Sequence, residues 1–312
     1  MGNMEQTTEI ANPIEVLEHN AVPVCRESVG EVPASEPVSV ETQIVTCARL
    51  DFSLNVDVLK QFVSEMAVLV DEAKIVFSVT DGLKAKIVDP AQIAMLETGI
   101  ALELLETFDW EPHRVTVQED GYIAEFGIDL GKIASYLKSL KLKDTVLKIS
   151  VDFEKRRMTV DAPTGQRVMS LIDTIGMSDP RMPTLNLPLE VEIHDQKAFK
   201  RALGEAATIS DHIAIRYDSA QNAIFLECEG DMDKMKAQVD AEIIFSEPSY
   251  LPSPGGPIKT MDTRSLFPLE YLTEFVKVIP QAFKLTIGND YPLKIEYGKT
   301  VYLLAPRIES GD

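Results

Sequence analysis

The stretch that decides the fold is LNVDVLKQFVSEMAVLVDEAKIVFSV, residues 54–79. Its apolar residues first recur at helical spacing, at Leu54, Val58, Leu59, Phe62, Val63, Met66 and Val70. Apolar and polar residues then alternate from Lys74 to Val79. The pattern predicts an amphipathic helix over 54–70 and a strand over 74–79. A second strand is expected over 83–88, because the turn dipeptide Asp81-Gly82 precedes it.

The same pattern returns about 140 residues further along the chain. An offset of 140 aligns Leu59-Lys60-Gln61 with Phe199-Lys200-Arg201, Asp71 with Asp211, Ile75 with Ile215, and Phe77 with Tyr217. An offset of 139 aligns Leu130 with Leu269, Ile133 with Leu272, and Lys138 with Lys277. A nearly constant register over some eighty residues predicts an internal repeat. The predicted fold is therefore α+β, with two tandem similar domains, each an antiparallel sheet packed on helices.

The remaining elements follow from the same two periodicities. Further helices are expected at 101–108, 130–140, 195–207 and 268–279. Further strands are expected at 122–128, 145–151, 157–162, 166–172, 212–217, 223–229, 235–245, 283–288, 292–297 and 300–304.

Composition also divides the chain into segments. Residues 1–44 contain eight glutamates and one basic residue, Arg26, and their Pro/Ser/Glu-rich stretch predicts a disordered acidic extension. We expect its removal to leave folding intact, and a short partner-binding helix over 12–18 is the alternative. The first domain is expected over 45–172 and the second over 188–312. Prolines predict an extended connector over 173–187 between them.

The charge balance restricts the classes of function. The 312 residues include 30 basic and 50 acidic side chains, a net charge of −20, whereas a protein that coats DNA with lysine and arginine is normally basic. The balance favours solubility, protein partners or metal chemistry. Three separated cysteines form no CxxC pair, and no apolar run approaches the ~20 residues of a membrane span. The first thirty residues lack a signal-peptide pattern, so we expect an intracellular protein.

Motifs of catalysis are missing from the sequence. Residues 127–132 have the wrong glycine spacing for a Walker loop, and no GxSxG, HExxH or GxGxxG occurs. The scattered histidines (His19, His113, His194, His212) are interpreted as surface or strand-edge residues. Asp231-Met232-Asp233 is interpreted as a solvated turn, since Met235 fails the next calcium-ligand position. We therefore expect no enzyme, no cofactor and no metal.

The charges on the four long helices and the turns after them differ from those of the whole chain. These segments hold seven acidic residues against nine basic ones: Lys60, Lys132, Lys138, Lys141, Lys143, Lys197, Lys200, Arg201 and Lys277. One interpretation is four ordinary solvated helix faces. The other is a mildly positive surface on an acidic body, which would hold a polyanion loosely.

Several strings resemble one known family from Val45 to Glu309. They are Leu69-Val70-Asp71-Glu72-Ala73-Lys74, Val88-Asp89-Pro90, Phe126-Gly127-Ile128-Asp129-Leu130, Ile209-Ser210-Asp211-His212-Ile213, Phe267-Pro268-Leu269-Glu270-Tyr271-Leu272, Tyr291-Pro292-Leu293-Lys294-Ile295-Glu296-Tyr297 and Tyr302-Leu303-Leu304-Ala305-Pro306-Arg307-Ile308-Glu309. In this order and spacing the chain resembles the archaeal-type DNA sliding clamps, the family of proliferating cell nuclear antigen.

The resemblance implies a closed ring of three identical subunits that encircles duplex DNA and has no catalysis of its own. The nine basic residues would face the DNA, which carries a negative charge every ~1.7 Å. The ring would tether DNA polymerase, the clamp loader, flap nuclease and ligase in replication and repair. Its place would be the nucleoid in an archaeal cytoplasm, or the nucleus in a eukaryote.

The resemblance also implies two further sites. A pocket for short partner peptides would comprise Gln92, Ile93, Met95, Met182, Pro183, Pro292, Leu303, Ala305 and Pro306, although Ile93, Met95 and Leu303 also fit an ordinary core. The subunit contact would pair the strand 166–172 with 223–229 of the next subunit. Its residues would be Arg167, Val168, Ser170, Ile224, Leu226 and Glu227, with Arg167 and Glu227 as charges that meet across the contact.

The chain departs from the family pattern in three places. The extension 1–44 and much of the excursion 247–259 have no counterpart, and Gln61 and Ala67 stand where basic residues are expected. Two alternatives therefore stay open. One is a clamp-related peptide-docking scaffold that does not encircle DNA, and the other is a metal-dependent hydrolase.

Overall fold

The computed structural model describes residues 46–114, 121–185, 187–245 and 262–307. The expectations for the extension 1–44 and for the excursion 247–259 lie outside the described residues. The described ranges belong to one compact unit, which spans 43–312. Of the helices in these ranges, none is both long and apolar enough to span a membrane.

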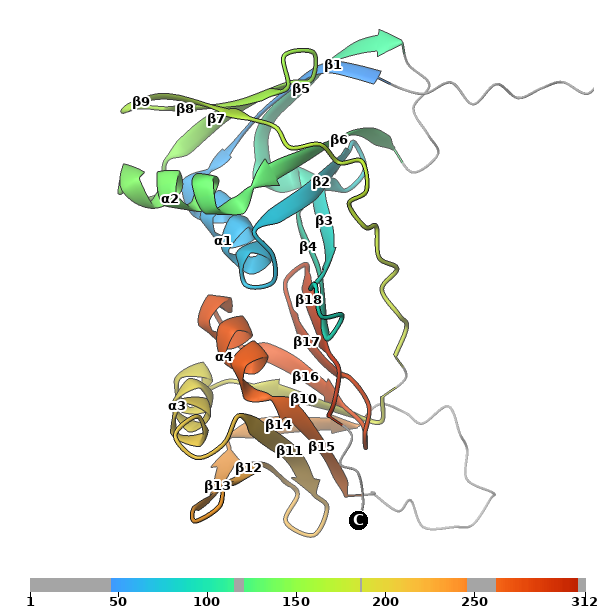
Figure 1. Cartoon of the computed structure of the whole chain (residues 1–312), viewed down its shortest axis with the longest axis vertical. Coiled ribbons are helices and arrows are strands. Elements are labelled where there is room, and N and C mark those ends of the chain that lie inside the picture. The colour runs from blue at the N-terminus through green and yellow to red at the C-terminus, as the bar shows by residue number, and fades with distance from the viewer. Residues whose placement is uncertain (1–45, 115–120, 186, 246–261, 308–312) are drawn as a thin grey trace, which may run out of the picture. The chain divides into compact units, whose positions relative to one another are not determined.

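The first half of the described chain combines two helices with nine strands (Figure 1). In chain order they are β1 (Thr46–Asn55), α1 (Val56–Ala67), β2 (Glu72–Ser78), β3 (Gly82–Val88), β4 (Ala94–Ile100), the short 3₁₀ turn η1 (Leu102–Leu104), β5 (Leu105–Arg114), β6 (Tyr122–Asp129), α2 (Leu130–Leu140), β7 (Val146–Asp152), β8 (Arg157–Ala162) and β9 (Gly165–Ser170).

The second half runs through the same order of helices and strands. Its elements are β10 (Leu189–Ile193), α3 (Gln196–Ala206), β11 (His212–Asp218), β12 (Ala223–Glu229), β13 (Lys234–Val239), β14 (Ala241–Phe245), β15 (Thr263–Pro268), α4 (Leu269–Val278), β16 (Phe283–Ile287), β17 (Leu293–Tyr297) and β18 (Thr300–Leu304).

The strand neighbours repeat as well. The order β5-β1-β7-β8-β9 of the first half recurs as β14-β10-β16-β17-β18 in the second, and β4-β3-β2-β6 recurs as β13-β12-β11-β15. All these strand pairings are antiparallel. The two similar halves of the chain, each with antiparallel strand pairing and two helices, confirm the predicted fold class.

A strand pairing joins the two halves into one continuous sheet. The last strand of the second half, β18, pairs with β4 of the first, so that Leu303 lies opposite Met95. The ladder continues past β18, because the Ala305 amide donates to the Ile93 carbonyl at 2.8 Å. The five strands of the second half and four strands of the first thus form one nine-stranded sheet.

The four helices form one layer in the order α2, α1, α4, α3 (Figure 1). Three of them begin at a side chain that accepts a backbone N–H: Asn55 before α1, Asp129 before α2 and Asp195 before α3. Each helix buries an apolar stripe, such as Leu59, Phe62 and Met66 on α1, against the sheets. The opposite faces of the helices, where most of the basic residues lie, stay exposed.

The structure corrects some of the predicted elements. Residues 101–108 were expected to form a helix, but one 3₁₀ turn leads into β5, which pairs with β1 from more than fifty residues upstream. The run 235–245 is two strands, β13 and β14, which belong to different sheets. The strands β1, β4, β10 and β15 were not predicted. For β5, β10, β14 and β15 a partner strand far along the chain, rather than local periodicity, determines the conformation.

Candidate DNA-facing, peptide-docking and subunit-contact sites

Most of the predicted DNA-facing residues lie exposed on the helix layer. On α2 and the turn after it, these are Lys132, Lys138, Lys141 and Lys143. On α3 and α4, Lys197 and Arg201 are exposed, Lys277 is 57% exposed and Lys200 is half-buried. Two of these lysines pair with an acid on their own helix or at its cap, Lys132 with Asp129 at 2.7 Å and Lys277 with Glu274. The layer therefore presents mostly exposed lysine and arginine side chains.

Lys60 is placed differently from the other predicted contacts. Its ammonium donates to the Leu142 carbonyl at 2.6 Å and lies 3.4 Å from Asp57, so it ties α1 to the turn after α2. Its neighbour Gln61 donates to the Val278 carbonyl at 2.8 Å and ties α1 to the end of α4. Because both side chains bind neighbouring backbone, α1 offers little for a DNA phosphate, which agrees with its low lysine content.

Glu65 is a residue whose role the sequence did not reveal. It was counted among the acidic residues of the helix faces, but only 4% of it is exposed. Its carboxylate accepts hydrogen bonds from Thr98 (2.5 Å), Thr300 (3.0 Å), Tyr297 (3.0 Å) and Gln61 (2.8 Å). Thr98 lies on β4 and Thr300 on β18, so this carboxylate lies at the joint between the two halves. Without Glu65, the four helices and the turns after them hold nine basic residues against six acidic ones.

The two tyrosines beside Glu65 belong to the same polar cluster. The Tyr302 hydroxyl donates to the Glu65 carbonyl at 2.9 Å. Burial is the main cause that raises the pKa of both Tyr297 and Tyr302, and the Glu65 carboxylate adds to it. Both phenols therefore stay protonated at any physiological pH and act as donors.

Several of the residues predicted for the peptide pocket lie at or beside the β4–β18 joint. Ile93 and Met95 are half-buried on one side, and Leu303 on the other is 5% exposed and lies opposite Met95. Ala305 and Pro306 follow β18 and are half-buried. Pro306 has no N–H to continue the ladder, so the strand pairing ends there.

A buried aspartate shapes the turn that carries Gln92. The Asp89 carboxylate accepts the amides of Ile93 and Ala94, each at 2.7 Å, and Gln92 is held at a φ of 59°. The Tyr271 hydroxyl of α4 also donates to Asp89, at 2.7 Å. Burial first, and then this hydrogen bond, raise the pKa of Tyr271 to about 12. The second half of the chain thus fixes the exposed Gln92 turn of the first.

The remaining pocket residues lie on other segments. Pro292 is half-buried immediately before β17, the strand next to β18. Met182 is half-buried and Pro183 exposed on the connector, which leaves the first half where Ile172 bridges to Gly127. Strand pairing groups the β4 and β18 residues, whereas the assignment of Met182 and Pro183 to the same pocket stays a prediction.

The structure corrects the predicted subunit contact on one side. Arg167, Val168 and Ser170 are exposed on β9, an outer strand of the five-stranded sheet, as predicted. The predicted partner strand is wrong: β12 pairs with β11 on one edge and β13 on the other, so it has no edge to offer.

The side chains of β12 are occupied as well. Ile224 and Leu226 are core residues, at most 1% exposed. Glu227 pairs with Arg216 at 3.0 Å, and it lies 3.7 Å from Lys236. Arg167 lies over the Tyr136 ring of its own chain, 5.1 Å from its centroid. The expected pairing of Arg167 with Glu227 is therefore replaced by contacts within the chain.

Comparison with known proteins gives these sites a context. No protein-family model matches the chain. It is 31% identical over 268 residues to the DNA polymerase sliding clamp of Methanocella arvoryzae, covering 83% of this chain and 98% of the relative. It is 30% identical over 261 residues to that of Methanococcoides burtonii, covering 81% and 96%.

Solved structures agree with these relatives. The structure of A. fulgidus PCNA bound to the C-terminal region of FEN-1 superposes with a TM-score of 0.67 at 26% identity, over 84% of this chain and all of that one. PCNA from Entamoeba histolytica shares the fold, with a TM-score of 0.67 at 18% identity over 84% of this chain. The chain belongs to the family of DNA polymerase sliding clamps, which confirms the interpretation drawn from its sequence.

Proposed function

We propose that this chain assembles head-to-tail into a closed ring of three subunits that encircles duplex DNA without catalysis of its own. The ring would tether polymerase and other replication and repair enzymes through the pocket at the β4–β18 joint. The observation that carries the proposal is the position of β9 and β13 in the internal repeat.

Both strands are outer strands of their sheets in the described chain. In the repeat, β9 is the counterpart of β18, and β13 is the counterpart of β4. Within the chain, β18 and β4 pair with each other. The same joint would form between chains if β9 of one subunit pairs with β13 of the next, and this contact would cover both edges.

The repeat also predicts the register of this contact. The β17–β18 turn lies between Tyr297 and Thr300, and the equivalent β8–β9 turn lies between Ala162 and Gly165. Leu303 and Val168 each come three residues after their turn, so they correspond to each other. The pair Leu83–Ile100 of the first half is equivalent to Ile224–Val239 of the second. Met95 comes five residues before Ile100, and Lys234 comes five residues before Val239, so these two also correspond. Since Leu303 lies opposite Met95, we expect Val168 opposite Lys234.

A charge swap tests this register and the ring together. Val168→Lys would place like charges opposite each other at every contact, at about 1 kcal/mol each. Because a ring of three has three contacts, we expect trimer formation to weaken by about a hundredfold in sedimentation experiments. Adding Lys234→Glu together with Glu229→Lys, which keeps an opposite charge across β12 and β13, should restore the trimer and its retention on closed circular DNA.

The control for this swap is Val146→Lys. Val146 is also an exposed valine of the five-stranded sheet, but its strand β7 is paired on both edges. This variant should remain trimeric. A wild-type chain that is monomeric at micromolar concentration would refute the ring and would favour the scaffold that does not encircle DNA.

The exposed basic residues of the helix layer give the second prediction. Lys138, Lys143 and Arg201 would contact phosphates without reading sequence. Changing all three to Glu should leave the trimer intact and shorten its retention on circular DNA. The salt dependence of weak binding to linear duplex should also lessen, by about 0.9 in the log–log slope for each lost contact.

The matched control is the change of Lys148, Lys155 and Lys299 to Glu. These three lysines are exposed on strands and turns outside the helix layer. This variant has the same net charge as the first, so it separates local contact from total charge. Equal retention of both variants would reject the assignment of the helix layer to DNA.

A further inference from the structure

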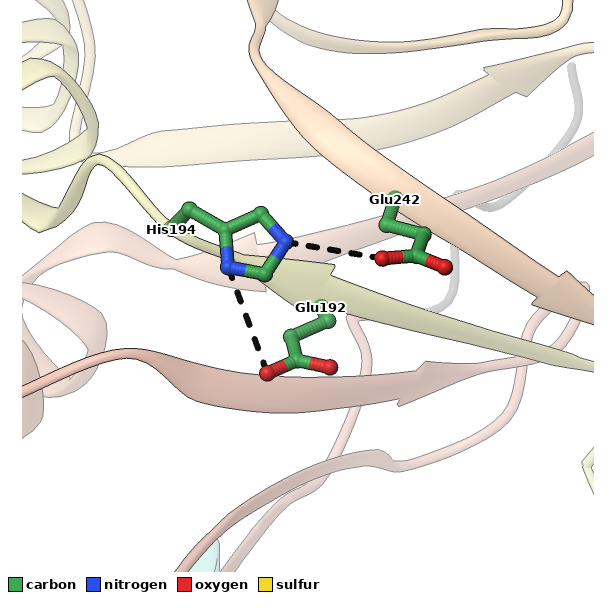
Figure 2. Close-up of side chains that lie close together, drawn as sticks. All are labelled: Glu192, His194 and Glu242. Carbon is green, nitrogen blue, oxygen red and sulfur yellow. Dashed lines mark ion pairs between the residues drawn. The ribbon is translucent and has the colours of Figure 1, made fainter.

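The outward face of β10 and β14 gathers three groups that ligate metals. Glu192 lies on β10, His194 is the first residue after that strand, and Glu242 lies on β14 (Figure 2). The imidazole lies between the two carboxylates: Nδ1 is 4.0 Å from a Glu192 oxygen and Nε2 is 3.7 Å from a Glu242 oxygen. One ligand atom from each residue lies within 4.8 Å of the others.

The two carboxylates lie directly opposite each other. Glu192 and Glu242 are partners in the antiparallel register of β10 and β14. Like charges in that position destabilise a sheet. Among the residues that the structure describes, His194 is the only basic residue in ion-pair contact with either of them.

The lysines of this face are already engaged. Lys284 lies opposite Glu192 on β16, but its ammonium pairs with Glu190 at 2.7 Å. Lys294 pairs with Glu296 at 2.7 Å. Within the described ranges of the chain, no lysine or arginine therefore lies within ion-pair distance of Glu192 or Glu242.

In the first half of the chain, the pair of residues that corresponds to Glu192 and Glu242 is uncharged. The counterpart of the Glu192–Glu242 pair is Ser53 on β1 opposite Thr107 on β5. The strands on the other side of β1 and β10 give the same correspondence. Lys148 of β7 lies opposite Ser53, and Lys284 of β16 lies opposite Glu192. The Ser53 and Thr107 hydroxyls share a hydrogen bond of 2.6 Å, so that pair is satisfied by itself.

We propose that Glu192, His194 and Glu242 form a binding site for a first-row divalent transition metal, with Zn²⁺ as the best fit. One imidazole nitrogen and two carboxylate oxygens are donors that zinc accepts, at about 2.0–2.2 Å. A tetrahedral ion needs such donors about 3.4 Å apart, so modest side-chain rotations close the site. His194 and Glu242 are 53% and 66% exposed, which leaves them free to rotate. The fourth position faces solvent and takes water.

The nitrogen donor selects the class of metal. Magnesium and calcium prefer oxygen ligands alone and more of them than this site offers. Zinc would neutralise the two opposed carboxylates and would hold β14 to β10 in addition to the backbone hydrogen bonds. The metal thus has a structural role, and no turnover is expected from it.

The test uses the full chain, freed of metal with a chelator and titrated with zinc chloride against a chromophoric indicator. The comparison variant carries Glu192→Ser and Glu242→Thr, which copies the pair of the first half. We expect the wild type to bind one zinc ion more per chain than this variant. Equal stoichiometry and affinity in the two proteins would overturn the proposal. His194→Gln alone should weaken zinc binding at this site by about tenfold or more.

Three controls make the result specific. His212→Gln removes another histidine, which lies beside the single carboxylate of Asp211, and it should leave the stoichiometry at the wild-type value. Millimolar magnesium should not displace the zinc, and displacement would contradict the assignment of a nitrogen donor. Zinc should raise the melting temperature of the wild type but not that of the Ser/Thr variant. None of these measurements uses DNA, so they test the zinc site independently of the proposed ring.

Discussion

Replacing Glu65 by alanine is expected to destabilise the protein by about 3–5 kcal/mol, the largest stability effect of any single side chain considered. The substitution removes the acceptor of Thr98, Thr300 and Tyr297, whose hydroxyls are buried at the joint of β4 and β18. Each buried donor that loses its partner costs about 1–3 kcal/mol, and the remaining hydroxyl contacts, such as that between Thr98 and Thr300, replace this acceptor only in part. Urea unfolding of the wild type and the variant measures the difference.

Two further variants separate the hydrogen bonds from helix propensity and charge. Glu65→Gln keeps the size and one acceptor oxygen, so we expect a loss of only about 1–2 kcal/mol. Glu205 lies at the same position of α3 in the repeat but is exposed. Glu205→Ala should therefore change stability by less than about 0.5 kcal/mol. A loss below 1 kcal/mol for Glu65→Ala would show that the cluster does not hold the joint together.

The second large effect is expected in partner binding. We predict that Ile93→Arg combined with Pro306→Ala weakens the binding of a partner peptide by more than ~2 kcal/mol, or about thirtyfold. The peptide carries a glutamine, an aliphatic residue and then two aromatic residues. Arginine at position 93 would place a charge in the half-buried surface beside the β4–β18 joint. Pro306→Ala would restore an N–H where the strand pairing now ends.

Fluorescence anisotropy of a labelled peptide measures this affinity. The matched control is Val146→Arg, which adds the same charge at an exposed valine of the five-stranded sheet. It should bind the peptide as the wild type does. Unchanged affinity in the double variant would exclude the β4–β18 joint as the docking site. A. fulgidus PCNA has been solved in complex with the C-terminal region of FEN-1.

The helices were the elements that the sequence predicted best. All four long helices were expected, and their observed bounds differ from the predicted ones by three residues or fewer. Each has an apolar stripe at helical spacing, and three have a capping side chain, so the signal is local. The error at 101–108 has the opposite cause. Leu102, Leu105 and Phe108 fit a helical stripe, but pairing with β1 overrides that preference.

The roles of several charged residues could not be predicted from the sequence, because these roles depend on burial and on strand pairing. Glu65 and Glu205 have the same place in the repeat, yet one is buried at a joint and the other is exposed. Glu192 and His194 are close in sequence, whereas Glu242 follows His194 by 48 residues. No spacing rule for metal ligands would connect them. Their proximity arises only because β14 pairs with β10.

The sequence alone determined the repeat, the α+β class, the helix layer with its basic residues and the family. These properties depend on periodicity and on short strings, which are local and survive without any knowledge of packing. The tertiary structure alone decided which strand edges are free, how β18 completes the sheet of the first half, and which side chains meet there. Strand pairing joins residues that lie more than two hundred positions apart, as Ala94 and Leu304 do. Such contacts leave no periodic trace in the sequence, because backbone hydrogen bonds do not depend on which side chains the strands carry.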